Sequence, residues 1–195
     1  MQVILLDTRY FRSPLQRKTE RQPGTGPYEA TPVPDATVLG DAQWTWLADQ
    51  LRQPAELRVI ASSIQVVAAD HGWEKWANFP RERERLFKLI EETKARGVIV
   101  VSGDRHTAEL SVERRQGPYP VYDLTASSLA NPLKPTAVVE GNTRRVGAVY
   151  RGVNFGLITI DWDSPDPRVA LKIQGIDGRD HITQDLQLSD LRAKE

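Results

Sequence analysis

A histidine follows a core strand in the segment GVIVVSGDRHTAEL, residues 97–110. Four apolar residues run directly into Ser-Gly-Asp-Arg-His, so a buried strand is expected to end by presenting His106. Gly103 permits a tight turn beside it, and Asp104 and Arg105 flank it. A rigid strand end is a suitable place for a metal ligand or a catalytic base. A histidine that only belongs to a structural loop is the alternative interpretation.

Two further apolar runs are also followed by polar side chains. Arg9 comes just after VILLD (3–7), and a guanidinium fork matches the oxygens of a phosphate group. Asp7 beside it is more simply explained as an ion-pair partner or as the cap of a turn. Gln65 follows LRVIA (57–61) and is by itself weak support for any chemistry. These residues could form one site only if the fold brings the ends of the apolar runs together.

The other two histidines have simpler interpretations. His71 lies in VVAADHGWEKWANF (66–79), where Trp73 and Trp76 are close in sequence, and is expected to be packed and hydrogen-bonded. His181, in DGRDHIT, is expected in a surface turn.

Composition excludes several classes of site. The 195 residues include no cysteine, which removes disulfides, zinc–thiolate sites and a cysteine nucleophile. The sequence has no Gly-x-Ser-x-Gly elbow, no phosphate-binding loop ending in Lys-Ser/Thr and no dinucleotide fingerprint. Twenty-six basic residues balance twenty-six acidic ones, so we expect no nucleic-acid partner. A metal site built from oxygen and nitrogen ligands remains the best fit.

The hydrophobic pattern indicates the elements that must position these side chains. Three short unbroken runs rich in Val and Ile, at 3–7, 57–61 and 98–102, suit strands covered on both faces of a parallel sheet. Helical spacing over 41–51 and 80–97 separates them. Right-handed crossovers then place all three strand ends at the same edge, where open α/β sheets bind ligands. The segments expected to converge there are DTR (7–9), SSIQ (62–65) and SGDRH (102–106).

The second predicted helix, 80–97, has a residue typical of a helix boundary at each end. Pro80 suits its first turn, and Gly97 suits a left-handed C-cap. The segment RERER (81–85) alternates in charge, which is typical of a solvated helix face.

The rest of the chain has the pattern of an antiparallel sheet. We predict one domain over residues 1–195, with a βαβαβ part at 1–110 that carries the site edge and a mainly antiparallel part at 111–190. The Pro- and Gly-rich segment 12–40 is expected to be a binding loop, and SDLRAKE a polar tail. The expected strands are VYDLTASS, TAVVE, RVGAVY, FGLITIDWD and VALKIQG.

Several long blocks together resemble the PhoD-like (alkaline phosphatase D) metallophosphatases, a family of the calcineurin-like metallophosphoesterases. The resemblance covers nearly the whole chain in the right order. It implies an α/β (α+β) fold, a two-sheet sandwich flanked by helices, with a two-metal site at strand ends that hydrolyses phosphate mono- or diesters. The blocks are VILLDTRYFRSPL, LGDAQWTWLADQL, IASSIQ with HGWEKWANFPRERERLFKLI, VVSGDRHTAELS, YDLTASSLANP and NFGLITIDWD.

The resemblance also implies roles for particular residues. His106 matches a metal ligand, and Gln65 falls where the wider superfamily often has a metal-ligating histidine. Asp104 and Arg9 are the expected catalytic residues, and Arg9, Arg105 and His71 the expected substrate-binding ones. Two divalent or trivalent ions are expected in a complete site, drawn from iron, calcium, manganese or zinc.

The chain departs from the family pattern at its start. Family members carry an N-terminal half with a metal-binding Asp strand, a Gly-Asp motif and a Trp-Asp-Asp-His stretch, and these are absent here. A two-metal centre needs several anionic ligands, including a bridging carboxylate. We therefore expect the C-terminal portion of a phosphatase, incomplete at its N-terminus and inactive alone, with apolar surface exposed. A half-domain completed by a partner chain is one alternative, and a non-catalytic binding module is another.

Cellular location is left open by the sequence. The longest apolar runs have four or five residues, far too few for a membrane span, and no signal peptide precedes the first run. The family that the chain resembles is often exported to the periplasm or secreted.

Overall fold

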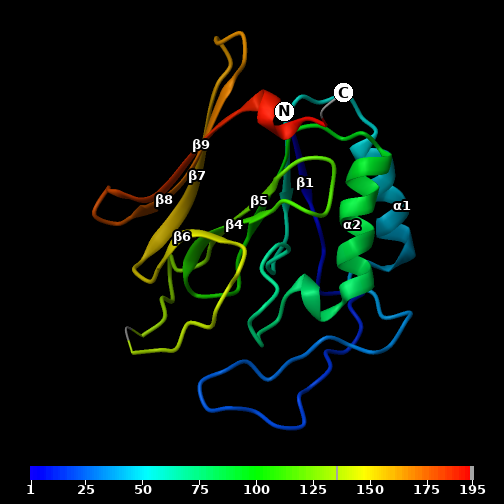
Figure 1. Ribbon diagram of the computed structural model, residues 1–195, viewed down its shortest axis with the longest axis vertical. Helices are drawn as coiled ribbons and strands as arrows, with labels where there is room; N and C mark the ends of the chain where they lie inside the picture. The colour runs from blue at the N-terminus through cyan, green and yellow to red at the C-terminus, as the bar shows by residue number, and fades with distance from the viewer. Residues whose placement is uncertain (135, 194–195) are drawn as a thin grey trace.

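The computed structural model describes residues 1–134 and 136–193, which form two β-sheets with two α-helices on one side (Figure 1). The larger sheet has six strands in the order β1-β2-β3-β5-β4-β6, and the smaller has three in the order β7-β8-β9. The strands are β1 (Gln2–Leu5), β2 (Arg58–Ala61), β3 (Val98–Ser102), β4 (Ala108–Glu113), β5 (Val121–Ala126), β6 (Arg145–Tyr150), β7 (Asn154–Asp161), β8 (Arg168–Gly175) and β9 (Asp180–Gln187). The helices are α1 (Gly40–Leu51), η1 (Trp76–Asn78), α2 (Pro80–Glu92) and η2 (Leu188–Leu191).

The three predicted parallel strands are confirmed. β1 pairs in parallel with β2, and β2 with β3, so that Ile4, Ile60 and Val100 lie in register across the sheet. The helices α1 and α2 connect consecutive strands and cover one face of the sheet. The predicted α/β class is therefore confirmed, and the two-sheet architecture with it.

The antiparallel part begins earlier than predicted and is joined to the parallel part. β4 is antiparallel to both β5 and β6, and the boundary predicted at residue 110 falls inside it. β5 lies between β3 and β4 and is parallel to β3. All but the last residue of β5 are buried, as expected of a central strand. The predicted strand TAVVE is wrong, because residues 136–140 form no strand.

The C-terminal segment holds a strand that the sequence analysis missed. β9 pairs antiparallel with β8, and His181 belongs to β9 rather than to a surface turn. Its ring stacks on Tyr150 with centroids 3.9 Å apart. The predicted polar tail SDLRAKE also needs correction, since its Leu191 is buried in η2; residues 194–195 lie outside the described residues.

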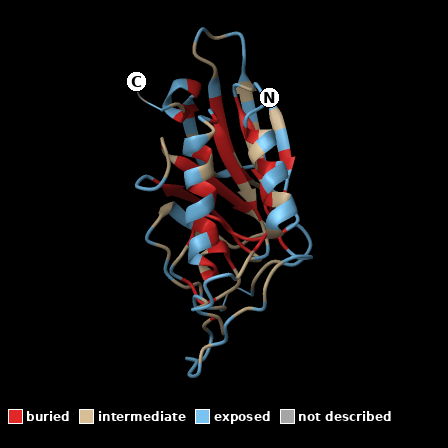
Figure 2. Cartoon of the chain, turned by 90° about the vertical axis from the view of Figure 1, so that its right-hand side faces the viewer, coloured by how far each residue is buried: buried red, intermediate tan, exposed pale blue. Residues whose placement is uncertain are grey.

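The core lies between the helices and the large sheet. Figure 2 shows buried residues on the strands and on the helix faces turned toward them. Apolar side chains spaced three or four residues apart give each helix one buried stripe. On α1 these are Trp44, Leu47 and Leu51, and on α2 they are Leu86, Phe87 and Ile90.

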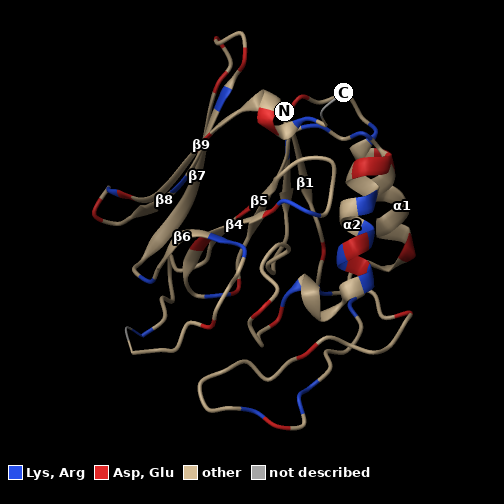
Figure 3. Ribbon diagram, in the orientation of Figure 1, with Lys and Arg blue, Asp and Glu red and all other residues tan. Residues whose placement is uncertain are grey.

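The start of α2 is not a solvated face. Pro80 begins the helix as predicted, but Glu82 and Arg83 of RERER are both buried. Arg83 pairs with Glu113 at 2.9 Å, which ties α2 to β4. Two of the alternating charges seen along the helix in Figure 3 therefore face inward. The reason is that this turn packs against both the loop before α1 and the large sheet.

Gly97 has a different role from the predicted helix cap. α2 ends at Glu92, with Thr93 as its C-cap, and Lys94 takes the left-handed conformation at φ 53°. Gly97, at φ 65°, lies just before β3, where an added Cβ would come within 2.2 Å of the Glu56 carbonyl oxygen. The glycine is thus required by close backbone approach at the entry to β3.

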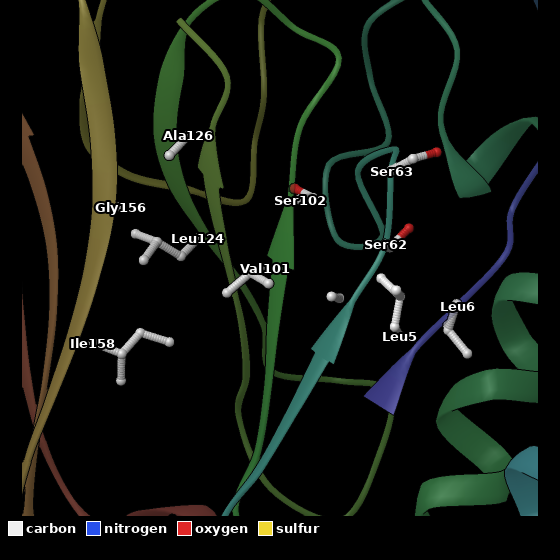
Figure 4. Close-up of a pocket in the computed structure, with 11 residues that line it drawn as sticks. Leu5, Leu6, Ser62, Ser63, Val101, Ser102, Leu124, Ala126, Gly156 and Ile158 are labelled. Carbon is white, nitrogen blue, oxygen red and sulfur yellow. The ribbon is translucent and has the colours of Figure 1, made fainter. Parts of the chain in front are cut away.

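The second face of the large sheet is only partly covered. The small sheet packs over β5, which leaves an open groove of about 470 Å³ between β1 and β7 (Figure 4). Val3 and Leu5 on this face are 62% and 74% exposed. The prediction of strands covered on both faces is therefore wrong for β1, an edge strand, whereas the expected exposure of apolar surface is confirmed. Among the described residues, no helix has the length and apolar character needed to cross a membrane.

Candidate active site

The ends of the parallel strands meet at one edge of the large sheet, at the lower end of the molecule in Figure 1. The hydroxyl groups of Thr8 and Ser63 are 2.6 Å apart, which joins the segments after β1 and β2. The Arg9 guanidinium donates to Asp104 Oδ1 at 3.2 Å, which joins the segments after β1 and β3. The predicted convergence of these three segments is confirmed.

Arg9 is held between two carboxylates at this edge. It donates to Glu74 Oε1 at 2.6 Å through one nitrogen and to Asp104 through the other. Its side chain remains 46% exposed, so guanidinium donors are open to solvent. Asp7 accepts the backbone N–H groups of Arg9 and Tyr10, each at 2.9 Å, and these bonds lower its pKa. Of the two interpretations left open for Asp7, the structure shows the turn cap.

The loop after β3 has an unusual backbone. Asp104 and His106 both take left-handed conformations, at φ 71° and 56°. Such conformations are uncommon outside glycine, and they are stabilised here by contacts to other segments. The carbonyl of His106 accepts the N–H of Leu133 at 2.9 Å. Its imidazole forms no hydrogen bond within the described part of the chain and is half-buried, so it is available to a ligand.

Gln65 and His71 lie together in a buried polar network. The Gln65 amide donates to Glu109 Oε1 at 2.7 Å and to Thr125 Oγ1 at 2.9 Å. Its oxygen accepts from His71 Nε2 at 2.8 Å, and His71 Nδ1 accepts the N–H of Trp73 at 3.1 Å. His71 is therefore the neutral Nε2–H tautomer. Both side chains have all their polar atoms in use, so metal ligation by Gln65 or substrate binding by His71 requires breaking these bonds.

The charge around His71 reinforces its neutral state. Burial lowers the pKa of His71 to about 2, and nearby cations add to this effect. The cations are Arg105, Lys75, Arg145 and Lys18. Arg105, one of the predicted substrate-binding residues, lies over the Trp73 ring at 5.8 Å from its centroid.

A buried aspartate that the sequence analysis missed positions the loop after β2. Asp123 accepts the N–H groups of Val66 and Val67 at 2.8 and 3.0 Å, and the hydroxyl of Ser102 at 2.6 Å. Burial raises the pKa of Asp123 against these three donors. The sequence did contain a sign of this role, because Asp123 is the one carboxylate inside the run VYDLTA of β5. A buried carboxylate is costly unless it is hydrogen-bonded.

Comparison with known proteins assigns this chain to a family. The family model for PhoD-like phosphatases matches residues 1–147, which include strands β1 to β5 of the large sheet and the first residues of β6. The chain belongs to the PhoD-like phosphatase family.

Two PhoD-like relatives illustrate the extent of the match. Alkaline phosphatase D of Bacillus subtilis (strain 168) is 27% identical over 113 residues, which cover 53% of this chain and 19% of that protein. A solved structure described as "Structure of PhoD" covers 95% of this chain and 38% of its own, with a TM-score of 0.67 and 16% identity. The chain thus spans well under half the length of these relatives, and the structural likeness shows the shared fold.

The ligand set for a metal is incomplete within the part of this PhoD-like chain that the structure describes. Asp104 and His106 lie in one loop and offer an oxygen and a nitrogen donor. No group of three or more His, Cys, Asp or Glu side chains suited to a metal ion occurs among the described residues. Since a two-metal centre needs several anionic ligands, these residues do not form one by themselves.

Proposed function

We propose that this chain forms part of the active site of a metal-dependent phosphate-ester hydrolase. The observation that carries the proposal is the hydrogen bond from Arg9 to Asp104 beside His106, whose imidazole forms no hydrogen bond within the described residues, in a chain of the PhoD-like phosphatase family. An exposed arginine, a carboxylate and an available imidazole at a sheet edge are suited to binding a phosphoryl group.

Each residue has a role in this proposal. His106 holds one metal ion, and Asp104 keeps Arg9 oriented at the edge. Arg9 neutralises the non-bridging oxygens of the phosphoryl group, whose charge increases in the transition state. Bound metal ions supply Lewis-acid polarisation of the phosphoryl group and a hydroxide nucleophile at neutral pH. The metals are iron, calcium, manganese or zinc, and the substrate is a phosphate mono- or diester.

The remaining metal ligands come from outside the described residues in this proposal, either from further sequence of the same polypeptide or from a partner chain. The incomplete ligand set supports this, as does the open groove beside β1. Sequencing the DNA upstream of Met1 in the same frame distinguishes further sequence of this polypeptide from a partner chain as the source of the ligands. An open frame that encodes Asp-rich strand ends supports further sequence, and an immediate stop codon supports a partner.

The role of His106 is tested by metal binding to the 195-residue chain. We expect His106→Ala to weaken the affinity for Mn²⁺ or Zn²⁺, measured by isothermal titration calorimetry, by about tenfold or more. The matched control is His181→Ala, which removes the exposed histidine of β9 and should leave that affinity unchanged. Hydrolysis of p-nitrophenyl phosphate by the isolated chain should be weak or absent.

A non-catalytic binding module is the second candidate, favoured by the incomplete ligand set. It predicts that His106→Ala changes neither metal affinity nor the activity of any assembled complex. That result would contradict the catalytic proposal.

A further inference from the structure

Three cations converge on the segment 71–75 that follows β2. Lys75 Nζ donates to the carbonyl of Trp73 at 3.4 Å, and Arg105 lies over the Trp73 ring. Lys18 comes from the long loop before α1, and its Nζ would lie 2.5 Å from a Cβ added to Gly72. We call Lys18, Lys75 and Arg105 the cationic cluster. Its members come from segments 12–40, 66–79 and 103–106, which are far apart in the sequence.

None of the three cations has an ion-pair partner within the described residues. Lys75 is only 4% exposed, and its bond to Trp73 is long and to a neutral oxygen. Buried ammonium groups are normally paired with a carboxylate, because removing the charge from water is costly. A buried lysine without such a pair, beside two further cations, is suited to binding an anion.

Four carboxylates lie near the cluster: Glu140 and Asp70 act on Lys75, and Glu109, Glu140 and Asp104 act on Arg105. Glu109 is paired with Arg145 and Asp104 with Arg9. Glu140 and Asp70 both favour the charged form of Lys75. The Glu140 oxygens, however, accept the N–H groups of Gly26 and Gly72 at 3.1 and 3.0 Å. One Asp70 oxygen accepts two donors of Thr143.

The protonation of Lys75 mainly reflects its burial. Burial, the largest cause, lowers its pKa to about 8, with Lys18 and Arg105 acting in the same direction against Glu140 and Asp70. An anion bound at the cluster would raise the pKa of Lys75 again, because its negative charge favours the charged form of the lysine.

We propose that Lys18, Lys75 and Arg105 form a binding site for a tetrahedral oxyanion of the phosphate type. Two ammonium groups and a guanidinium fork are the donors that such an anion prefers. Arg105 lies between Asp104 and His106 in the sequence, so the site adjoins the proposed catalytic edge. The role of the site rests on the proposed function, because an ester substrate carries this group; free inorganic phosphate has the same chemistry.

The test is phosphate binding to the whole 195-residue chain in chelator-treated, metal-free buffer at neutral pH. Inorganic phosphate is titrated calorimetrically into the wild type and into Lys18→Met and Lys75→Met. We expect each substitution to weaken binding by about tenfold or more, because each removes a charged donor. The matched control is Lys88→Met on α2, an exposed lysine paired with Glu92, which should bind phosphate as the wild type does. Thermal unfolding shows whether each variant is folded.

Phenyl phosphate distinguishes the two sources of the anion. Competition between the monoester and inorganic phosphate assigns the site to the substrate, whereas binding of inorganic phosphate alone assigns it to the free anion. A folded wild type that binds neither, or equal binding by wild type, Lys18→Met and Lys75→Met, overturns the inference.

The test also separates this inference from the proposed function. Phosphate binding without any metal-dependent hydrolysis in an assembled complex overturns only the proposed function. Hydrolysis with KM unchanged by Lys18→Met and Lys75→Met overturns only the inference.

Discussion

At the scale of single residues, the loop after β3 uses backbone strain to present side chains. Asp104 and His106 both occupy the left-handed region, at a cost of about 1–3 kcal/mol for each residue. The bonds from Arg9 to Asp104 and from the Leu133 N–H to the His106 carbonyl hold the loop in place. The conformation of this loop is thus stabilised by segments distant in the sequence, which a motif alone does not show.

The buried lysine of the cationic cluster makes the stability of the chain depend on pH. Burial lowers the pKa of Lys75 from 10.5 to about 8, so the folded chain disfavours its charged form. This penalty is fully present below pH 8, declines between pH 8 and 10.5, and is absent above that range. We expect Lys75→Met to raise the free energy of unfolding at pH 7 by about 1–3 kcal/mol and to lose this advantage at pH 10.5.

Urea unfolding followed by tryptophan fluorescence at the two pH values measures this effect. Lys88→Met, an exposed substitution on α2, serves as control and should change stability little at either pH. A Lys75→Met chain that is less stable than the wild type at neutral pH would contradict the prediction. Higher stability together with weaker phosphate binding is the combination expected of a residue kept for binding.

At the scale of elements, the first turn of α2 is a junction rather than a surface. The Glu82 carboxylate accepts the Val38 N–H at 2.7 Å, the Thr37 hydroxyl at 2.7 Å and the Trp44 indole N–H at 2.8 Å. One side chain therefore ties α2 to α1 and to the end of the long loop. Arg83 ties α2 to β4 through its ion pair with Glu113.

Removing the Glu82 carboxylate should destabilise this junction. We expect Glu82→Ala to lower the free energy of unfolding by about 3–5 kcal/mol, because it leaves buried donors without an acceptor. Glu84→Ala, an exposed position on the same helix, should stay within about 0.5 kcal/mol of the wild type. Chemical denaturation of the two variants measures the difference, and equal losses at both positions would refute the role given to Glu82.

Element types were predictable where the hydrophobic signal was long or continuous. The run VIVVS became β3 with the predicted bounds, and Leu86 and Ile90 of the apolar stripe on α2 are buried as spacing required. The failures came where tertiary contacts outweighed local pattern. Charged residues of RERER were buried because ion-pair and hydrogen-bond partners met them there. His181 joined a strand because β8 supplied a partner edge.

At the scale of the whole molecule, the open groove distinguishes this chain from a closed sandwich. The groove is lined by apolar side chains of both sheets, including Leu5, Val101, Leu124 and Ile158 (Figure 4). β1 borders it as an edge strand with Val3 and Leu5 exposed. Exposed apolar edges of this kind favour association with other chains.

Introducing a charge at the groove should reduce self-association. We expect Leu5→Lys to lower the self-association of the 195-residue chain, measured by sedimentation velocity over a range of concentrations. Because Leu5 is 74% exposed, the free energy of unfolding should change by only about 0.5 kcal/mol. Leu129→Lys, an exposed leucine away from the groove lining, is the control. Identical association by Leu5→Lys and the wild type would show that the groove does not drive it.

The sequence by itself determined the parallel strands and the edge at which they end, because unbroken apolar runs are a local pattern and crossover handedness follows a general rule. It also supplied the candidate residues at that edge, which are Arg9, Asp104, Arg105 and His106. Only the tertiary structure decided the surroundings of those residues. The hydrogen bonds of Gln65 and His71, the burial of Asp123 and the meeting of Lys18 with Lys75 and Arg105 join distant segments. The desolvation and charge of a site depend on what the fold packs around it, and no single segment of sequence contains that information.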